Sequence, residues 1–279
     1  MKIAPLRVLL VSGAVLLSIV IYLLPSQIHP RGELAEKNES ESSPEVFNPE
    51  ALLTSAEKSL DSAQLESLRF LQSAHEKNGE QDTAALDGLG RFWDRIGIAS
   101  AAAIWFEKKA RIAETESAWL DAAYRYFDAF RIAEDSMMKD ILVQKAINAY
   151  ERVLSINPAN LNAKTDLGAC YADGTSEPMK GIMLLREVVT ANPDHEMAQY
   201  NLGMLSIKSG QTDKAIERFN NVLRINPKRM EIHFYLGQVH LQKGDTLKAI
   251  ESYETFIRNA PYDASDVMEL VKTLKQKQS

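Results

Sequence analysis

Several features that would indicate catalysis or nucleic-acid binding are scarce in this sequence of 279 residues. The net charge is −6 and no stripe of Lys and Arg is visible, which excludes a nucleic-acid backbone as the main partner, because binding phosphates needs clustered cations. A single cysteine, Cys170, excludes an intramolecular disulfide. We expect Cys170 to be a small buried residue, since free cysteines are among the most buried residue types.

Sequence motifs of enzymes are missing as well. The chain contains no glycine-rich phosphate loop, no Gly-x-Ser-x-Gly and no cysteine-based site. His233 and His240 are seven residues apart and are expected to pack between helices, and the pairs His75-Glu76 and His195-Glu196 lack a second set of metal ligands. We therefore expect a protein with no enzymatic activity, no metal site and no cofactor.

Prolines recur at a nearly constant interval in the C-terminal half of the chain, and so do the residues between them. Pro158, Pro193, Pro227 and Pro261 are separated by 35, 34 and 34 residues. A repeat of this size buries its apolar face by stacking on its neighbours, which produces an extended groove instead of a closed pocket. The recurring positions are Leu167-Gly168, Leu202-Gly203 and Leu236-Gly237 in the first half of each repeat, and Gly181, Ala215 and Ala249 with Leu185, Phe219 and Tyr253 in the second half.

Each repeat is predicted to form two antiparallel helices. Gly174, Gly210 and Gly244 mark the turn between them, because glycine accepts the left-handed conformation that ends a helix. The glycine of each Leu-Gly pair is expected to let the two helix backbones approach closely. The Asn before each of the first three prolines is expected to end the second helix, and the proline prevents its continuation.

These positions resemble the tetratricopeptide repeat, whose pattern has a large residue, Leu-Gly, an aromatic residue, a small Ala, an aromatic residue and a closing Pro. Two stretches match it closely, YNLGMLSIKSGQTDKAIERFNNVLRINP from Tyr200 and FYLGQVHLQKGDTLKAIESYETFIRNAP from Phe234. The resemblance covers residues 82–261. It implies an all-α fold, a right-handed superhelical solenoid of antiparallel helix pairs. One repeat departs from the pattern because Gly181 stands where Ala is usual.

The repeats divide the chain into segments. We expect about five repeats in 82–262, a degenerate helical pair at 49–81 and a capping helix at 263–279 that shields the last repeat. The repeat that starts near Glu116 has about eleven additional residues near 132–142. They either lengthen one helix or form a loop on the rim, and length alone does not decide between the two.

The N-terminus carries an apolar run at residues 8–24, preceded by Lys2 and Arg7. As a helix, 17 residues rise about 26 Å, which is within the range of a single membrane span. A cleaved signal peptide is the alternative, but the run is longer than the usual apolar region of about 7 to 15 residues, and no small-x-small cleavage site follows it. We favour a retained signal-anchor.

The charges around this run predict the topology. Residues 1–7 would lie in the cytoplasm as the basic n-region, and the repeats would lie outside it, in the periplasm of a Gram-negative bacterium or as a eukaryotic type II protein. Residues 25–48 lack apolar periodicity and are rich in Glu, Ser and Pro, which is typical of a flexible tether. The predicted location is therefore a single-pass membrane protein with its repeats outside the cytoplasm.

The resemblance also implies a binding surface, because the first helix of each repeat lines the concave face in this family. An apolar, aromatic groove with few charges would suit a protein or peptide segment with apolar anchors. The alternative for each of these side chains is packing between adjacent helices. The candidate groove residues are Leu120, Tyr124, Phe127, Tyr200, Met204, Ile207, Phe234, Gln238 and Leu241, with Thr165 and Ala169 between them.

The predicted function is that of a non-catalytic, membrane-anchored scaffold for protein–protein interaction. Relatives that bind chaperones grip a peptide carboxylate with Lys and Asn, but the matching positions here are Thr165, Ala169, Asn201, Glu231 and Tyr235, so we expect weak binding of acidic C-terminal peptides. The alternatives are a structural subunit of an envelope complex and an apoprotein-holding factor of the cytochrome c maturation type, which shares the layout of anchor, tether and groove. The partner's identity and the oligomeric state do not follow from the sequence.

Overall fold

The computed structural model describes residues 47–260 and 263–277, all of which belong to one compact unit that spans 47–279. The described residues form thirteen α-helices and no strand. None of these helices combines the length and apolar character needed to cross a bilayer. The predicted anchor at 8–24 and the tether up to residue 46 lie outside the described residues, so both stay predictions.

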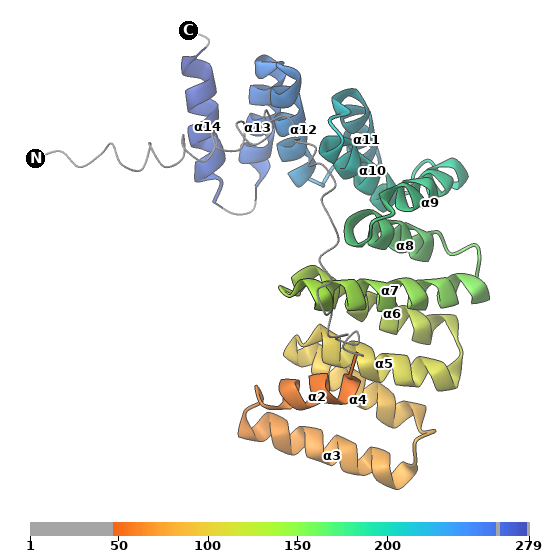
Figure 1. The fold of residues 1–279 in the computed structure, drawn as a ribbon. Helices are drawn as coiled ribbons and strands as arrows, with labels where there is room; N and C mark the ends of the chain where they lie inside the picture. Colours follow the sequence, from red (N-terminus) through yellow and green to blue (C-terminus); the bar gives the residue numbers. More distant parts are fainter. Residues whose placement is uncertain (1–46, 261–262, 278–279) are drawn as a thin grey trace, which may run out of the picture. The chain divides into compact units, whose positions relative to one another are not determined.

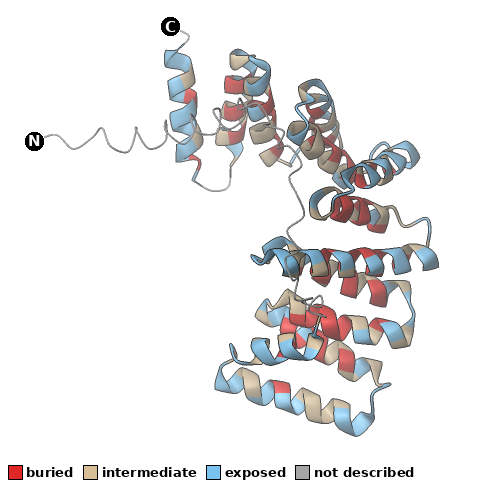
Figure 2. Ribbon diagram, in the orientation of Figure 1, coloured by how far each residue is buried: buried red, intermediate tan, exposed pale blue. Residues whose placement is uncertain are grey.

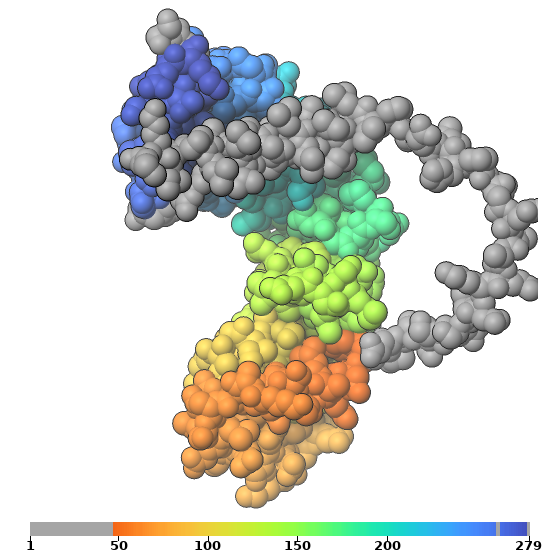
Figure 3. Space-filling model, turned by 60° about the vertical axis from the view of Figure 1, so that its left-hand side comes forward, coloured from red at the N-terminus to blue at the C-terminus, as the bar shows by residue number. Residues whose placement is uncertain are grey.

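The helices follow one another in pairs, and each pair packs on the next (Figure 1). The first two helices depart from this arrangement, because α2 packs chiefly against α5, and α3 against α4. Figure 3 shows the surface changing colour in chain order from α2 to α14, so each region of it belongs to helices that are adjacent in sequence. The helices are α2 Pro49–Glu57, α3 Ser62–Asn78, α4 Thr83–Ile96, α5 Ala99–Ala113, α6 Glu116–Ile132, α7 Ser136–Ile156, α8 Leu161–Gly174, α9 Pro178–Ala191, α10 Glu196–Lys208, α11 Thr212–Ile225, α12 Glu231–Lys243, α13 Thr246–Asn259 and α14 Ser265–Gln276.

Short polar side chains begin several of these helices, and asparagines end three of them, α7, α9 and α11. Asp61 and Gln64 form a reciprocal capping box at the start of α3, and Asn160 accepts a hydrogen bond from the Ala163 amide at the start of α8. Asn157 and Asn226 are the C-terminal caps of α7 and α11, as expected from the proline that follows each of them. Local signals at these helix ends therefore contribute to the repeat spacing of the sequence.

The glycines serve two different purposes, which corrects the prediction for three of them. Gly210 and Gly244 have positive φ angles, 70° and 86°, as expected for turns. Gly174 is instead the last residue of α8, where a Cβ atom would lie 2.4 Å from Val143 of α7. At Gly203 and Gly237 the rings of Phe219 and Tyr253 fill the space of the absent side chain, and not a neighbouring backbone. A Cβ atom at these two positions would lie 2.7 and 2.5 Å from the ring carbons.

The additional residues near 132–142 lengthen two helices. They form the end of α6 and the start of α7, so these helices have 17 and 21 residues, compared with 13 or 14 in the following pairs. Asp135 caps α7 by accepting a hydrogen bond from the Met138 amide at 2.7 Å. The extra residues therefore build helix instead of a loop on the rim.

The core runs along the contacts between helices (Figure 2). Its largest cluster joins α5, α6, α7 and α8 and contains Cys170, which is fully buried as predicted. At the C-terminal end, α14 covers α13 with Val271, its buried residue. Separate smaller clusters occupy the later pairs, so the array has a chain of local cores and not one common centre.

Candidate functional site

The first helices of three successive pairs share one hollow of ≈ 480 Å³. It is lined by α6, α8 and α10, and by Arg229 from the turn that precedes α12. On each helix the lining residues are three or four positions apart, so they form one stripe of the helix surface. The lining residues are Tyr124, Phe127, Asp128 and Arg131 of α6, Asp166, Ala169, Ala172 and Asp173 of α8, and Met197, Tyr200, Asn201, Met204, Leu205 and Lys208 of α10.

Four of the nine candidate groove residues lie in this hollow, namely Tyr124, Phe127, Tyr200 and Met204. All four are partly exposed although they are large and apolar or aromatic. Tyr200 is held between the Tyr235 ring, at 6.0 Å, and the Arg229 guanidinium, at 5.1 Å from the Tyr200 ring centre. The hollow therefore presents aromatic side chains in fixed positions.

The other candidates do not line the hollow, although some pack against the same clusters as the four that do. Leu120 packs against the cluster of α5 to α8, and Ile207 against that of α11 and α12. Phe234 lies between Tyr253 and Phe256, with ring centres 5.7 and 5.5 Å away, and thus packs inside its own pair. Leu241 packs against the α13 cluster and Gln238 is exposed, but neither lines the hollow. Thr165 is 1% exposed and donates its hydroxyl to the Leu161 carbonyl, while Ala169 forms part of the floor.

Charged side chains are more frequent here than the sequence indicated. The expectation of few charges was wrong, because six of the fifteen lining residues are charged. Two of the charges neutralise each other, since Lys208 Nζ lies 2.5 Å from Asp173. Arg229 donates to Glu196 at 2.6 Å and also pairs with Glu231. Helical spacing from the expected groove residues, Tyr124 to Asp128 and Ala169 to Asp166, was the signal in the sequence that would have found them.

Asp166 differs from the other charged residues of the hollow. Its pKa is raised to about 6, chiefly by burial and also by the charge of Asp128, while the nearby Tyr150 hydroxyl acts in the opposite direction and lowers it. No cation of the described chain forms an ion pair with Asp166 or Asp128. The hollow therefore contains a half-buried carboxyl group without a positive partner, which is uncommon in proteins.

A network of polar side chains fixes the wall of the hollow. The Asn226 side-chain amide donates to Glu196 at 3.1 Å, and Glu196 in turn accepts from Arg229 at 2.6 Å. Glu196 is the first residue of α10, and its negative charge interacts favourably with the helix dipole there. The turn after α11 is thereby tied to the helix that carries Tyr200 and Met204.

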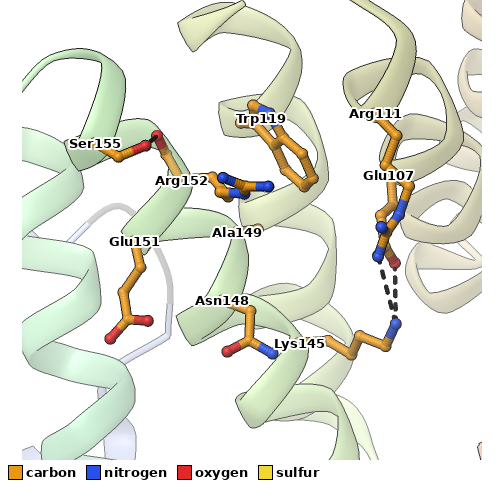
Figure 4. A pocket seen from close by; sticks show the side chains of 9 residues that line it. All are labelled: Glu107, Arg111, Trp119, Lys145, Asn148, Ala149, Glu151, Arg152 and Ser155. Carbon is orange, nitrogen blue, oxygen red and sulfur yellow. Dashed lines mark hydrogen bonds and ion pairs between the residues drawn. The ribbon is translucent and has the colours of Figure 1, made fainter. Parts of the chain in front are cut away.

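A second hollow, of ≈ 400 Å³, lies chiefly between α5 and α7 (Figure 4). Arg152 stacks on the Trp119 ring at 5.8 Å, and Lys145 lies 3.3 Å from Glu107. Glu107 also accepts hydrogen bonds from Arg111 and from the Tyr126 hydroxyl. Glu107, Arg111 and Lys145 are engaged with one another and Arg152 with Trp119, and this arrangement is more suited to joining α5, α6 and α7 than to holding a ligand.

Groups that could hold a metal ion are not found in the described part of the chain, where no three His, Cys, Asp or Glu side chains gather. His233 and His240 are half-buried, and burial lowers the pKa of both. The fully buried Cys170 thiol has a raised pKa because of burial and the charges of Asp166 and Asp173, so it is a weak nucleophile at neutral pH.

Comparison with known proteins supports a tetratricopeptide repeat protein. Residues 202–264, from within α10 to the residue before α14, match the family model described as tetratricopeptide repeat. No curated protein sequence matches the chain significantly. The family model therefore covers most of the two stretches, beginning at Tyr200 and Phe234, that resemble the repeat pattern.

Solved structures of similar fold are numerous but distant in sequence. PilW, described as a widely conserved type IV pilus biogenesis factor, is 17% identical with a TM-score of 0.56, and the alignment covers 70% of this chain and 86% of that chain. MamA residues 41 to the end from Desulfovibrio magneticus RS-1 is 19% identical with a TM-score of 0.52, covering 65% of this chain and 96% of that one. At these identities the likeness shows the fold alone.

Proposed function

We propose that this chain is a non-catalytic, membrane-anchored scaffold that holds a segment of another protein in the hollow between α6, α8 and α10. The observation that carries the proposal is the set of partly exposed Tyr124 and Phe127 on α6 and Tyr200 and Met204 on α10, which line one hollow together with α8. Apolar area that stays exposed on a folded protein gains free energy when a partner covers it. Because each pair contributes one helix, the surface extends along several repeats and suits an extended or helical segment.

Membrane attachment is the second part of the proposal. It rests on the apolar run at 8–24, the basic residues Lys2 and Arg7 before it, and the Glu-, Ser- and Pro-rich residues 25–48 that follow. In this arrangement the repeats lie outside the cytoplasm, on a tether that leaves them free to reach partners near the membrane. Fractionation of cells that express the tagged full-length chain tests this part, and recovery of the chain in the soluble fraction would contradict it.

Partner capture tests the binding surface. The full-length chain, kept in solution with a mild non-ionic detergent, would be immobilised and exposed to a membrane-plus-envelope extract, with retained proteins identified by mass spectrometry. The double variant Tyr200→Ala, Met204→Ala should lose the partner. Met183→Ala is the matched control, because Met183 is 61% exposed on α9 and does not line the hollow. A partner retained equally by all three chains would place the interaction on another surface.

The assembly subunit remains the competing function, and self-association is its signature. The C-terminal end of the array is covered by α14, which packs on α13 through Val271. A covered end opposes open head-to-tail stacking. Sedimentation over a range of concentrations distinguishes the two functions, since a scaffold for other proteins needs no concentration-dependent increase in mass.

A further inference from the structure

The charges of the hollow carry information about the partner beyond its apolar anchors. Asp128 and Asp166 form no ion pair with any cation of the described residues, whereas Asp173, Lys208 and Arg229 are all paired within the chain. The remaining lining cation, Arg131, is exposed and lies three residues beyond Asp128 on α6. The unpaired side chains of the hollow therefore sum to one negative charge, and the less exposed of the two carboxyl groups is Asp166.

The buried side of Asp166 is occupied by a second polar group that also lacks a partner. Tyr150 is 0% exposed, and its hydroxyl makes no hydrogen bond of good geometry. It nevertheless lies near enough to Asp166 to lower the pKa of that group. The Tyr150 ring stacks edge-on against Tyr124 of the hollow, with ring centres 5.9 Å apart. Buried hydroxyls are nearly always hydrogen-bonded, so this group is placed to donate to an ionised Asp166.

Aromatic rings line the same hollow as this carboxyl group. Tyr124 and Phe127 from α6 and Tyr200 from α10 line the hollow together with Asp166. The faces of such rings attract cations, and Tyr200 already holds the Arg229 guanidinium at 5.1 Å in this way. A carboxylate framed by aromatic faces is suited to a cationic head on an apolar stem, which is the structure of Lys and Arg side chains.

We infer that the partner segment inserts a Lys or Arg side chain into the hollow, where its cation pairs with Asp166 and Asp128 and its stem packs on Tyr124, Phe127 and Tyr200. This inference rests on the proposed function and adds the chemistry of the ligand. The pair would satisfy a carboxylate that has no cation in the free chain, and this is why the binding energy concentrates at this position.

A random dodecapeptide phage library, selected on the full-length chain at neutral pH, is the probe for this inference. Enriched sequences should share one Lys or Arg among apolar residues. Resynthesis of an enriched peptide with citrulline for Arg, or norleucine for Lys, should weaken its binding by about ten-fold, because a charged hydrogen-bonded pair is lost. The variant Asp166→Asn should bind the enriched peptide with similarly reduced affinity. It should also bind the enriched peptide and its neutral analogue equally well.

The outcomes separate the inference from the function on which it rests. Peptides that bind, lose binding in Tyr200→Ala, Met204→Ala and keep full affinity with the neutral residue would leave the scaffold intact and overturn the cationic anchor. A library that gives no peptide dependent on this double variant would overturn both. Nearly equal thermal melting of wild type and Asp166→Asn near pH 4, where the pH approaches the ordinary carboxyl pKa of 3.8, shows that the variant is folded.

The pH profile of binding supplies a second readout. Below about pH 6 Asp166 becomes protonated in the free chain, so binding of the cationic peptide should weaken as the pH falls through this range, and binding near pH 6 should release protons. The titratable groups that face Asp166 are Tyr124 and Asp128 on α6, Tyr150 on α7 and Cys170 on α8. Asp166→Asn should remove most of this dependence, and an unchanged profile would contradict the pairing.

Discussion

A Cβ atom on Gly181 would lie 2.3 Å from the carbonyl oxygen of Gly168, which is closer than any real Cβ contact. The reciprocal contact is also tight, since a Cβ atom on Gly168 would lie 3.1 Å from the Gly181 oxygen. Helices α8 and α9 thus meet backbone to backbone at these two glycines. This explains why Gly181 occupies a position where the repeat pattern has Ala, and why this departure from the pattern is part of the structure.

Replacing Gly181 by Ala should therefore destabilise the protein, although it restores the common residue of the pattern. The methyl group would force α8 and α9 apart, and overpacking of this kind costs about 1–3 kcal/mol, more than the gain in helix propensity of roughly 0.5–1 kcal/mol. Urea unfolding followed by circular dichroism measures the change.

The matched control is Gly88→Ala in α4. A Cβ atom there would lie 3.6 Å from Leu71, an ordinary contact, so the exchange should stabilise by about 0.5–1 kcal/mol through helix propensity. Equal effects of the two exchanges would show that α8 and α9 do not approach as closely as their backbones indicate.

Asp166→Asn should stabilise the free chain at neutral pH. The folded-state pKa of Asp166, about 6, is above its ordinary value of 3.8, so the native state binds this proton more tightly than the unfolded state does. The resulting destabilisation is fully present above pH 6 and disappears as the pH falls through 6 towards 3.8. We expect a gain of about 1–3 kcal/mol near pH 7.5 and almost none near pH 4.

Thermal melts of wild type and variant at both pH values test this expectation. Asp263→Asn is a suitable control, since Asp263 is exposed beyond α13 and lines none of the hollows described above. A variant that is less stable than wild type at neutral pH would mean that Asp166 is satisfied by groups of the chain itself, and the argument for a cationic partner would lose its basis.

Glu107→Gln should have the opposite effect. Burial raises the pKa of Glu107. The Tyr126 hydrogen bond and the cations Arg111 and Lys145 together lower it by more, so the net pKa is below the ordinary 4.5. A lowered carboxyl pKa contributes stability above pH 4.5 that is lost as the pH falls through the folded-state value. The variant should lose about 1–2 kcal/mol at neutral pH and differ little from wild type in acid.

The control for this exchange is Glu254→Gln. Glu254 also pairs with a lysine, Lys275, but the pair is exposed to solvent, so its loss should change the melting temperature little. Similar losses for the two variants would indicate that the hydrogen bonds of Glu107 to Tyr126 and Lys145 contribute no more than a surface ion pair.

The sequence predicted the helices better than it predicted the hollow, for physical reasons. Helix ends depend on local signals, so Asn157, Asn226 and Gly244 could be assigned from their neighbours in the chain. Whether Phe234 faces a ligand or Tyr253 depends on the packing of a second helix, which periodicity does not specify. Thus Tyr200 was located in the hollow while Phe234 was not.

Glycine roles show the same limit. Gly174 and Gly244 read alike in the sequence, as glycines in the turn between two helices, but only Gly244 has a positive φ, and Gly174 makes room for Val143 of the preceding pair. The sequence did not indicate Asp166, because its distinguishing property is that no cation of the neighbouring helices pairs with it. This property depends on the packing of α6, α8 and α10, which the sequence does not specify.

The separate cores differ in size, so we expect local unfolding of the array to begin where the core is smallest. The cluster of α5 to α8 contains 18 buried residues, whereas that of α13 and α14 contains four among the residues described. Because each pair is stabilised by its own core and its nearest neighbours, transient unfolding should start at α14 and spread inward, and the amide protons of α6 and α7 should exchange with solvent last. Tyr200, between these extremes, would lie where a fluctuating segment meets a rigid one, so a ligand that bridges α6 and α10 would also slow exchange in the helices beyond it.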